Sequence, residues 1–344
     1  MTSVVHSTPA RDGVRVLVTA VPFAGHDRRP LELLDAAGID YVLNPHHRKL
    51  TEDELAALVP GVDALIAGTE PITGRVLAAA DRLRLISRVG IGLDSVDLGA
   101  AHARGIKVAY TPDAPADAVS ELTIGLMLSL LRSIPWSNAQ IHQGGWQRLL
   151  GRRLGDLTVG IIGVGRVGRR VLRHLEGFSP RRVLLNDLAV DDRLSRDGVQ
   201  WTTKASLLRE SDVVTIHVPL TAATRNMVRR DELLAMKPDA TIINTARGGI
   251  INELDLRDVL VAGHLAGAAL DVFEHEPYSG PLAGTDRCLL TAHMGSMAAD
   301  CRSRMEIEAT AEAVGFLQGK PLQREVPQEE YDAIASGMIA PRDV

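Results

Sequence analysis

Aromatic residues are scarce in this chain of 344 residues, at 3% of the sequence, whereas hydrophobic residues reach 45%. The core is therefore expected to consist mainly of Leu, Val, Ile and Ala side chains. Cysteines are limited to Cys288 and Cys301, so the chain can form at most one disulfide, and it has no C-x-x-C pair. We expect two reduced thiols and no metal site, because clustered cysteines and an HExxH motif are both absent.

The chain also lacks an excess of positive charge and long hydrophobic runs. Its formal net charge of -5 excludes a broad cationic surface for nucleic acid or anionic lipid. No uninterrupted hydrophobic run approaches the roughly 18 residues that a membrane span needs. The first residues, MTSVVHSTPARDG, have no hydrophobic stretch typical of a signal peptide. We therefore expect a soluble, cytoplasmic protein that binds neither nucleic acid nor membranes.

What the chain has instead is a regular alternation of short hydrophobic runs and helix-like stretches. Strands that alternate with helices are typical of parallel sheets with helices packed on their faces. Thr51 and Glu54 have the spacing of a capping box at the start of one such helix. The predicted fold class is therefore α/β, with two doubly wound sheets. The predicted strands are 15–20, 41–44, 64–68, 84–90, 107–111, 158–163, 182–187, 213–218, 240–245, 265–272 and 288–293.

The chain is long enough for two domains with separate cores. The segment TPDAP (111–115) interrupts the alternation, and a long hydrophobic helix follows it from Ser120. A helix predicted at about 298–318 would return to the first domain. We therefore expect a first domain of residues 13–112 plus 298–344, interrupted by a second domain of residues 113–297, with no further regulatory domain.

Three glycines follow a predicted strand in GIIGVGRVGRR (160–170). Such a triplet is weak on its own, but a strand before it and a helix after it favour a dinucleotide-binding turn. Gly163 would allow the tight turn, Gly165 the approach of a pyrophosphate, and Gly168 close packing of the helix on the strand. The backbone amides of Arg166 and Val167 would then face the phosphates from the start of the helix.

Asp187 ends the next predicted strand, where a carboxylate can accept hydrogen bonds from the adenosine ribose. The same carboxylate would repel a 2′-phosphate, and the residues that follow, Leu188 and Ala189, supply no arginine. NAD is therefore the expected cofactor, rather than NADP. The alternative is a glycine-rich turn that binds no ligand, with an unrelated surface aspartate nearby.

Ionisable residues follow three later strands, in INTARGG, ALDVFEHEP and LLTAHMG. The carboxyl ends of parallel strands meet at one edge of a sheet, so we expect these residues to converge. His293 has the side chain best suited to proton transfer near neutral pH, and Glu276 would orient its ring and stabilise its protonated form. Arg247 would hold a carboxylate through two parallel hydrogen bonds. The alternative is a structural network of Arg, Glu and His.

Taken together, several segments resemble the D-2-hydroxyacid dehydrogenase family, and within it the phosphoglycerate dehydrogenase branch. The resemblance implies an NAD-dependent oxidoreductase that interconverts a 2-oxo acid and a D-2-hydroxy acid by hydride transfer. It also implies a flavodoxin-like substrate domain interrupted by a Rossmann NAD-binding domain, and a homodimer formed through the latter. The segments are SRVGIGLDSVD, SELTIGLMLSLLR, GIIGVGRVGRR, HVPLTAATRNM, INTARGG, GAALDVFEHEP and LLTAHMG.

The resemblance also implies roles for individual residues. Arg247, Glu276 and His293 would be the substrate-binding and proton-transfer residues. Asp271 would contact the nicotinamide side of the cofactor. Backbone amides of one turn would bind the substrate carboxylate, and two residues would line the adenine pocket: these are Gly90, Ile91 and Gly92 for the turn, and His217 and Pro219 for the pocket.

The chain departs from the resemblance at Gly68, Thr69 and Glu70, where phosphoglycerate dehydrogenases often have an arginine for the substrate phosphate. Phosphoglycerate is therefore a doubtful substrate. Two alternative functions remain open. One is a catalytically silent NAD(H)-sensing regulator with the same fold. The other is a dehydrogenase of another small acid in the same superfamily, although its formate branch has Gln where Glu276 stands.

Overall fold

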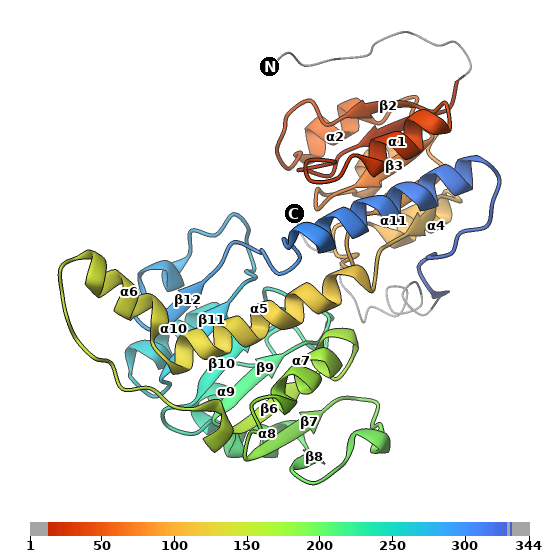
Figure 1. Cartoon of the computed structure of the whole chain (residues 1–344). Helices are drawn as coiled ribbons and strands as arrows, with labels where there is room; N and C mark the ends of the chain where they lie inside the picture. Colours follow the sequence, from red (N-terminus) through yellow and green to blue (C-terminus); the bar gives the residue numbers. More distant parts are fainter. Residues whose placement is uncertain (1–12, 329–330, 332–344) are drawn as a thin grey trace. The chain divides into compact units, whose positions relative to one another are not determined.

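The structure is a computed structural model that describes residues 13–328 and 331, and these residues form two compact units (Figure 1). Unit 1 takes the described residues up to Pro115 and from Ala298 onward, and unit 2 is Ala116–Met297. The sequence predicts the corresponding boundaries after residues 112 and 297. Two parts of the chain lie outside the described residues. They are residues 1–12, whose sequence is not typical of a signal peptide, and residues 329–330 and 332–344 of the predicted first domain.

Unit 1 contains a five-stranded parallel sheet in the order β2-β1-β3-β4-β5, which is the order of flavodoxin-like sheets. β3 and β4 are buried at every position, as expected for central strands covered on both faces. Each of the five strands falls on a predicted hydrophobic run. The strands are β1 (Arg15–Val18), β2 (Asp40–Leu43), β3 (Ala64–Ala67), β4 (Leu85–Arg88) and β5 (Lys107–Ala109).

The helices of unit 1 include one, α11, that follows unit 2 in the sequence. The predicted capping box is confirmed at α2, because Thr51 and Glu54 each accept a hydrogen bond from the other's backbone. In Figure 1 the blue helix α11 lies beside α1, and Ser87 of β4 donates to the carbonyl oxygen of Ala309 at 2.8 Å. Unit 2 is thus inserted into unit 1. The helices are α1 (Arg29–Ala36), α2 (Glu52–Leu58), α3 (Gly74–Ala79), α4 (Leu98–Ala103) and α11 (Ala299–Leu317).

Unit 2 contains a seven-stranded parallel sheet in the order β12-β11-β10-β9-β6-β7-β8. The order reverses between β6 and β9, which marks the switch point where ligands bind in such sheets. The prediction of six strands was wrong by one, because β8 has three residues and only its first is buried. The strands are β6 (Thr158–Ile162), β7 (Arg182–Asn186), β8 (Val199–Trp201), β9 (Val213–Ile216), β10 (Thr241–Asn244), β11 (Gly267–Leu270) and β12 (Cys288–Leu290).

Helix α5 (Ala114–Leu131) leads into unit 2 and begins inside the TPDAP segment, earlier than predicted. Pro115 sits in its first turn, where a missing backbone N–H costs no hydrogen bond. Among the described residues it is the one helix whose length and composition would suit a membrane span, and 56% of that window is buried in the protein. The inner face of α5 packs in one hydrophobic core with β6 and with α7, the helix that follows β6. The other helices are α6 (Ile134–His142), α7 (Arg166–Glu176), α8 (Lys204–Glu210), α9 (Arg230–Ala235) and α10 (Glu253–Val261), with 3-10 turns at Leu154–Asp156, Asp192–Leu194 and Pro281–Gly284.

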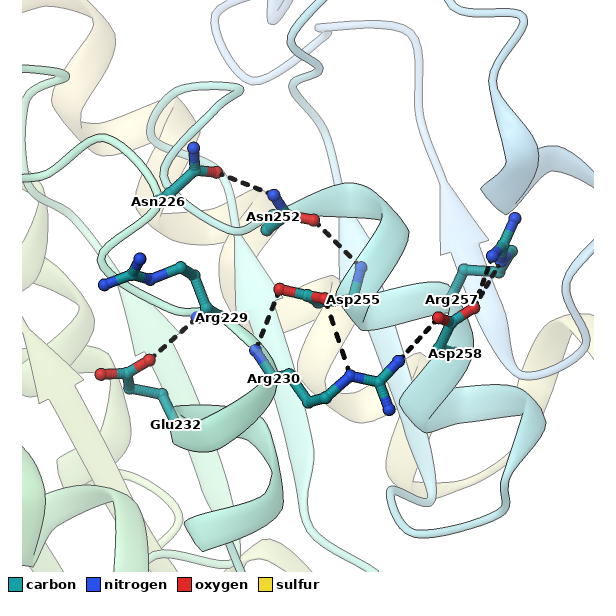
Figure 2. A network of polar contacts seen from close by, with 8 residues as sticks. All are labelled: Asn226, Arg229, Arg230, Glu232, Asn252, Asp255, Arg257 and Asp258. Carbon is teal, nitrogen blue, oxygen red and sulfur yellow. Dashed lines mark hydrogen bonds and ion pairs between the residues drawn. The ribbon is translucent and has the colours of Figure 1, made fainter.

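A polar network ties the start of α9 to α10 (Figure 2). The backbone N–H of Arg230 donates to the Asp255 carboxylate at 3.1 Å. Asn252 caps α10 by accepting from the backbone N–H of Asp255 at 3.0 Å, and its amide donates to Asn226 at 3.3 Å. The backbone N–H of Asn226 in turn donates to the carbonyl oxygen of Gly249 at 2.7 Å. Capping of this kind contributes about 1 kcal/mol, and here it also anchors the segment that follows β10.

Candidate active site

The loops that follow β6 and β9 touch each other at the switch point of unit 2. Gly163 follows β6 with a φ of +91°, and a Cβ added there would lie 2.5 Å from the carbonyl oxygen of His217. The backbone N–H of His217 donates to the carbonyl oxygen of Ile162 at 2.7 Å. Both the positive φ and the close approach therefore require glycine at this position.

The other two glycines of the turn have different surroundings. Gly165 precedes α7, no side chain caps that helix, and a Cβ added at Gly165 would meet no atom within 4 Å. A Cβ at Gly168 would lie 2.0 Å from the carbonyl oxygen of Gly163, so α7 packs directly on the turn. Arg166 and Val167 begin α7, where backbone amides have no acceptor within the helix. Open space beside such amides suits a pyrophosphate.

Asp187 follows β7 and is fixed beside this turn. Its Oδ2 accepts from the backbone N–H of Val164 at 2.6 Å, and its Oδ1 accepts from that of Ala189 at 3.2 Å. Arg169 is paired with Asp191 at 2.9 Å and donates to the carbonyl oxygen of Val164 at 3.1 Å. The turn therefore holds a half-buried carboxylate where the ribose of a dinucleotide would need an acceptor.

His217 carries a buried ring nitrogen that has no hydrogen-bond partner among the described residues. Its Nε2 lies 2.9 Å from the Thr215 hydroxyl, whereas Nδ1 is buried and has no hydrogen-bond partner in the part of the chain that the structure describes. Burial lowers the pKa of the imidazole to about 3, so the ring is neutral. Buried polar atoms in proteins almost always have a hydrogen-bond partner, and a bound ligand can supply one to this nitrogen. Pro219 follows in the same loop and is exposed.

His293 and Glu276 form a direct pair. The His293 Nδ1 and Glu276 Oε2 atoms are 2.8 Å apart, and Glu276 Oε1 accepts from the backbone N–H of Phe273 at 3.0 Å. The carboxylate is thus held by its own loop. The His293 side chain is 42% exposed, and within residues 13–328 its Nε2 has no hydrogen-bond partner. That nitrogen is open to a ligand, while the other one is oriented by the carboxylate.

Asp271 fixes the turn that carries His293. It follows β11, is 1% exposed, and its Oδ1 accepts from the Thr291 hydroxyl at 2.6 Å and from the backbone N–H of Met294 at 2.9 Å. Its Oδ2 accepts from the backbone N–H of Gly295 at 2.8 Å. These three bonds lie on both sides of the imidazole in the sequence. The positioning of His293 is a structural role for Asp271 that the sequence analysis does not foresee.

Arg247 follows β10 on a turn that is held from two sides. The buried Asn244 side chain accepts from the backbone N–H of Ala246 at 3.0 Å and donates to the carbonyl oxygen of Arg247 at 2.8 Å. A Cβ added at Gly248 would lie 1.9 Å from the carbonyl carbon of Phe273. The Arg247 turn therefore packs on the same backbone that positions Glu276. Arg247, Glu276 and His293 follow three neighbouring strands, β10, β11 and β12.

The predicted substrate turn, Gly90 to Gly92, belongs to unit 1 and follows β4. Gly90 has a φ of +144°, and its backbone N–H donates to the Thr111 hydroxyl at 2.8 Å. The backbone amides of Ile91 and Gly92 donate to no acceptor among the residues that the structure describes. Two adjacent amides of this kind can bind a carboxylate.

Three supporting residues are missing from the sequence analysis: Asn244, Thr291 and Gly248. The first two are polar residues at or just after the end of a hydrophobic strand, TIIN and CLLT, and this was a usable signal. Gly248 is the first of two glycines that follow Arg247, and this pair is a weaker signal in the sequence. No group of three or more His, Cys, Asp or Glu side chains in the described ranges could hold a metal ion.

Comparisons with known proteins agree with this geometry. Residues 124–295 match the model of the D-isomer specific 2-hydroxyacid dehydrogenase, NAD binding domain. Hydroxypyruvate reductase of Thermotoga maritima is 34% identical over 287 residues, which cover 80% of this chain and 93% of that protein. D-3-phosphoglycerate dehydrogenase of Methanocaldococcus jannaschii is 33% identical over 84% of this chain, but the match covers only 57% of that longer protein.

The fold is similar to that of solved structures. A crystal structure of a protein from Thermus thermophilus has a TM-score of 0.83 and 33% identity, and the match covers 91% of this chain and 100% of that one. The predicted family, α/β fold class, NAD cofactor and dehydrogenase class are thereby confirmed. The roles of individual residues stay predictions. The chain belongs to the D-isomer specific 2-hydroxyacid dehydrogenase family.

Proposed function

We propose that this protein interconverts a 2-oxo acid and a D-2-hydroxy acid, and that His293 and Glu276 are its proton-transfer pair. The contact of 2.8 Å between the imidazole and the carboxylate carries this proposal. His293 donates a proton from Nε2 to the substrate oxygen during reduction and accepts it during oxidation. Glu276 stabilises the protonated ring and keeps Nε2 directed away from itself. Bound NADH supplies the hydride that substrate C2 receives.

Binding of the acid is assigned to two groups. The Arg247 guanidinium binds the substrate carboxylate through parallel hydrogen bonds and polarises the neighbouring oxygen. The backbone amides of Ile91 and Gly92, in the turn that follows β4 of unit 1, are also assigned to the binding of a carboxylate. Two observations support this assignment. The amides of Ile91 and Gly92 have no hydrogen-bond acceptor within the described residues, and Arg247 lies on a turn that the Asn244 side chain holds.

The cofactor is assigned to the switch point of unit 2. The amides of Arg166 and Val167, together with the open space at Gly165, would receive the pyrophosphate. Asp187 would bind the adenosine ribose, and His217 and Pro219 would line the adenine pocket. Asp271 would lie on the nicotinamide side. The buried Nδ1 of His217, which has no hydrogen-bond partner within residues 13–328, supports a ligand in this loop.

A screen of NADH oxidation tests the proposed reaction. We expect turnover with at least one of glyoxylate, hydroxypyruvate, pyruvate and phosphonopyruvate, followed by the loss of NADH absorbance. NADPH should be a poorer reductant because the Asp187 carboxylate repels its 2′-phosphate. If the protein binds NADH, measured by fluorescence, but oxidises it with none of these acids, the NAD(H)-sensing alternative replaces this proposal.

We also propose a homodimer formed through unit 2, in a cytoplasmic protein that binds neither nucleic acid nor membranes. The negative net charge and the scarcity of cysteine support the location and the choice of partners. Helix α6 and the segment after it expose hydrophobic side chains, which is typical of an interaction surface. These are Ile134 at 52%, Ile141 at 51%, Trp146 at 87% and Leu150 at 99% exposure.

Light scattering coupled to size-exclusion chromatography tests the dimer. We expect the mass of a dimer for the wild type and of a monomer for the double variant Trp146→Asp, Leu150→Asp. Leu188→Asp is the matched control, because Leu188 is a fully exposed leucine elsewhere in unit 2. A monomeric wild type, or a dimeric double variant, would contradict the proposed interface.

A further inference from the structure

A buried guanidinium lies beneath the turn from Gly90 to Gly92 in unit 1. Arg88 is the last residue of β4 and is 4% exposed. Its side chain donates to the carbonyl oxygen of Val89 at 3.3 Å and, through Nε, to that of Gly92 at 3.0 Å. A Cβ added at Gly90 would lie 3.7 Å from both terminal nitrogens of the guanidinium. The turn therefore folds over the arginine, which holds it at both ends.

The same guanidinium also binds the end of the neighbouring strand, β3. It donates to the carbonyl oxygen of Ala67 at 3.3 Å and to that of Gly68. Ala67 lies opposite Arg88 in the parallel pairing of β3 with β4, and both strands are buried at every position. Arginine suits this place because its planar fork offers five N–H donors, whereas lysine offers three donors on a single atom. Arg88 thus ties the turn to the buried centre of the sheet.

Thr111, which lies just after β5, holds Gly90 itself. The backbone N–H of Gly90 donates to the Thr111 hydroxyl at 2.8 Å, and the carbonyl oxygen of Gly90 accepts from the backbone N–H of Thr111 at 3.0 Å. The C=O and N–H groups of a trans peptide point in opposite directions, so the N–H of Ile91 points away from Thr111. The amides of Ile91 and Gly92 have no acceptor among the described residues. Arg88 and Thr111 therefore bind the carbonyl groups around the turn and leave two amides for a ligand.

We propose that Arg88 is a positioning residue for substrate binding, which orients the amides of Ile91 and Gly92 toward a carboxylate by holding the carbonyl groups around them. This inference rests on the proposed function, because it takes the turn as a carboxylate-binding site. It goes beyond that function by assigning the orientation of the turn to a buried side chain that acts through hydrogen bonds to the backbone. Loss of these hydrogen bonds should weaken binding of the acid more than it slows the chemical step, since the amides bind the carboxylate both before and during hydride transfer.

The variant Arg88→Met tests the inference. Methionine removes the N–H donors and keeps an unbranched side chain that can stay buried. NADH oxidation is measured with the best acid of the screen over a range of acid concentrations. We expect the KM for the acid to rise by about 10-fold or more, because hydrogen bonds to a charged group are weakened, while kcat stays within about 3-fold of the wild type. The affinity for NADH, measured by fluorescence, should not change, because the dinucleotide-binding turn lies in unit 2.

The KM and kcat values separate this role from a merely structural one. A variant that is partly unfolded would have a lower apparent kcat, but its folded fraction would keep the wild-type KM. An unchanged KM in the folded Arg88→Met protein overturns the inference and leaves the proposed function intact. A wild type without activity on any 2-oxo acid overturns the proposed function itself.

The variant Arg88→Lys separates the hydrogen bonds from the charge. Lysine keeps a positive charge beneath the turn, but donors on a single atom cannot reach the end of β3 and both ends of the turn together. We expect its KM to stay about 10-fold or more above that of the wild type. A lysine variant with the wild-type KM overturns the inference. If circular dichroism shows that neither Arg88 variant folds, Arg88 serves the fold rather than the turn, and the inference is overturned as well.

Arg84→Met is the matched control. Arg84 precedes β4 at the opposite end of the strand from the turn, and its side chain is 50% exposed, 3.6 Å from Asp63. The substitution is the same and removes the same charge, but it should leave the KM for the acid unchanged. An equal rise of KM in this variant would show a general effect of arginine loss and would also overturn the inference.

Discussion

Replacement of His293 by alanine is expected to lower kcat by about 100-fold or more, the lower end of what general acid–base catalysis contributes. The imidazole is the group that we propose to move the substrate proton. Its Nδ1 lies 2.8 Å from Glu276, and its Nε2 has no hydrogen-bond partner in the part of the chain that the structure describes. Steady-state NADH oxidation with the best acid of the screen measures the loss. Added imidazole should restore part of the activity, because the missing group can then be supplied from solution.

His275→Ala is the control for this prediction, because it removes an exposed imidazole from the loop that also carries Glu276. Its kcat should stay within about 2-fold of the wild type, as surface substitutions have small effects. A His293→Ala protein with wild-type turnover would remove His293 from its proposed role.

Replacement of Gly248 by alanine should lower kcat/KM by about 100-fold or more, since displacement of a catalytic group by roughly 1 Å can cost that much. The added Cβ would lie 1.9 Å from both the carbonyl carbon and the carbonyl oxygen of Phe273, and 2.4 Å from the backbone nitrogen of Glu274. These are backbone atoms, so no side-chain rotation relieves the clash. Either the Arg247 turn or the segment that positions Glu276 has to shift.

Gly284→Ala is the matched control, because a Cβ at Gly284 meets no atom within 4 Å and its φ is not positive. It should leave kcat/KM unchanged. The Gly248→Ala protein should still bind NADH, measured by fluorescence, because the turn from Gly163 to Gly168 is not part of the clash. If Gly248→Ala keeps full activity, then the tight packing between the two turns does not position the catalytic groups.

The positions of the strands follow from the sequence better than their ends do. The predicted run 265–272 extends beyond β11 at both ends, because Leu265 and Val272 are hydrophobic in the sequence. In the structure β11 ends before Asp271, whose carboxylate binds the loop that follows β12. β8 was missed because a three-residue edge strand has too little hydrophobic pattern to be distinguished. The predicted start of α5 at Ser120 is too late, because the prolines of TPDAP interrupt the pattern in the sequence, whereas the first turn of a helix tolerates proline.

The candidate site residues were chosen from the sequence by their place after strands, but their hydrogen-bond partners could not be predicted in the same way. Nothing in ALDVFEHEP indicates that Asp271 binds the loop after β12, since that contact depends on the neighbouring positions of β11 and β12 in the sheet. The same holds for Asn244, whose side chain bridges its own turn. The departure from the family at Gly68, Thr69 and Glu70 is visible in the sequence, but the burial of the Glu70 side chain is not.

The low pKa of His217 has a thermodynamic consequence for unit 2. In the folded protein the pKa of this ring is about 3, so the ring stays unprotonated until the pH falls to that value. In the unfolded chain the ring takes up a proton near its ordinary pKa of 6.5. Between those two values the unfolded state binds more protons, so acidification in this window progressively favours unfolding. The feature that leaves Nδ1 available to a ligand thus makes the dinucleotide-binding unit sensitive to acid.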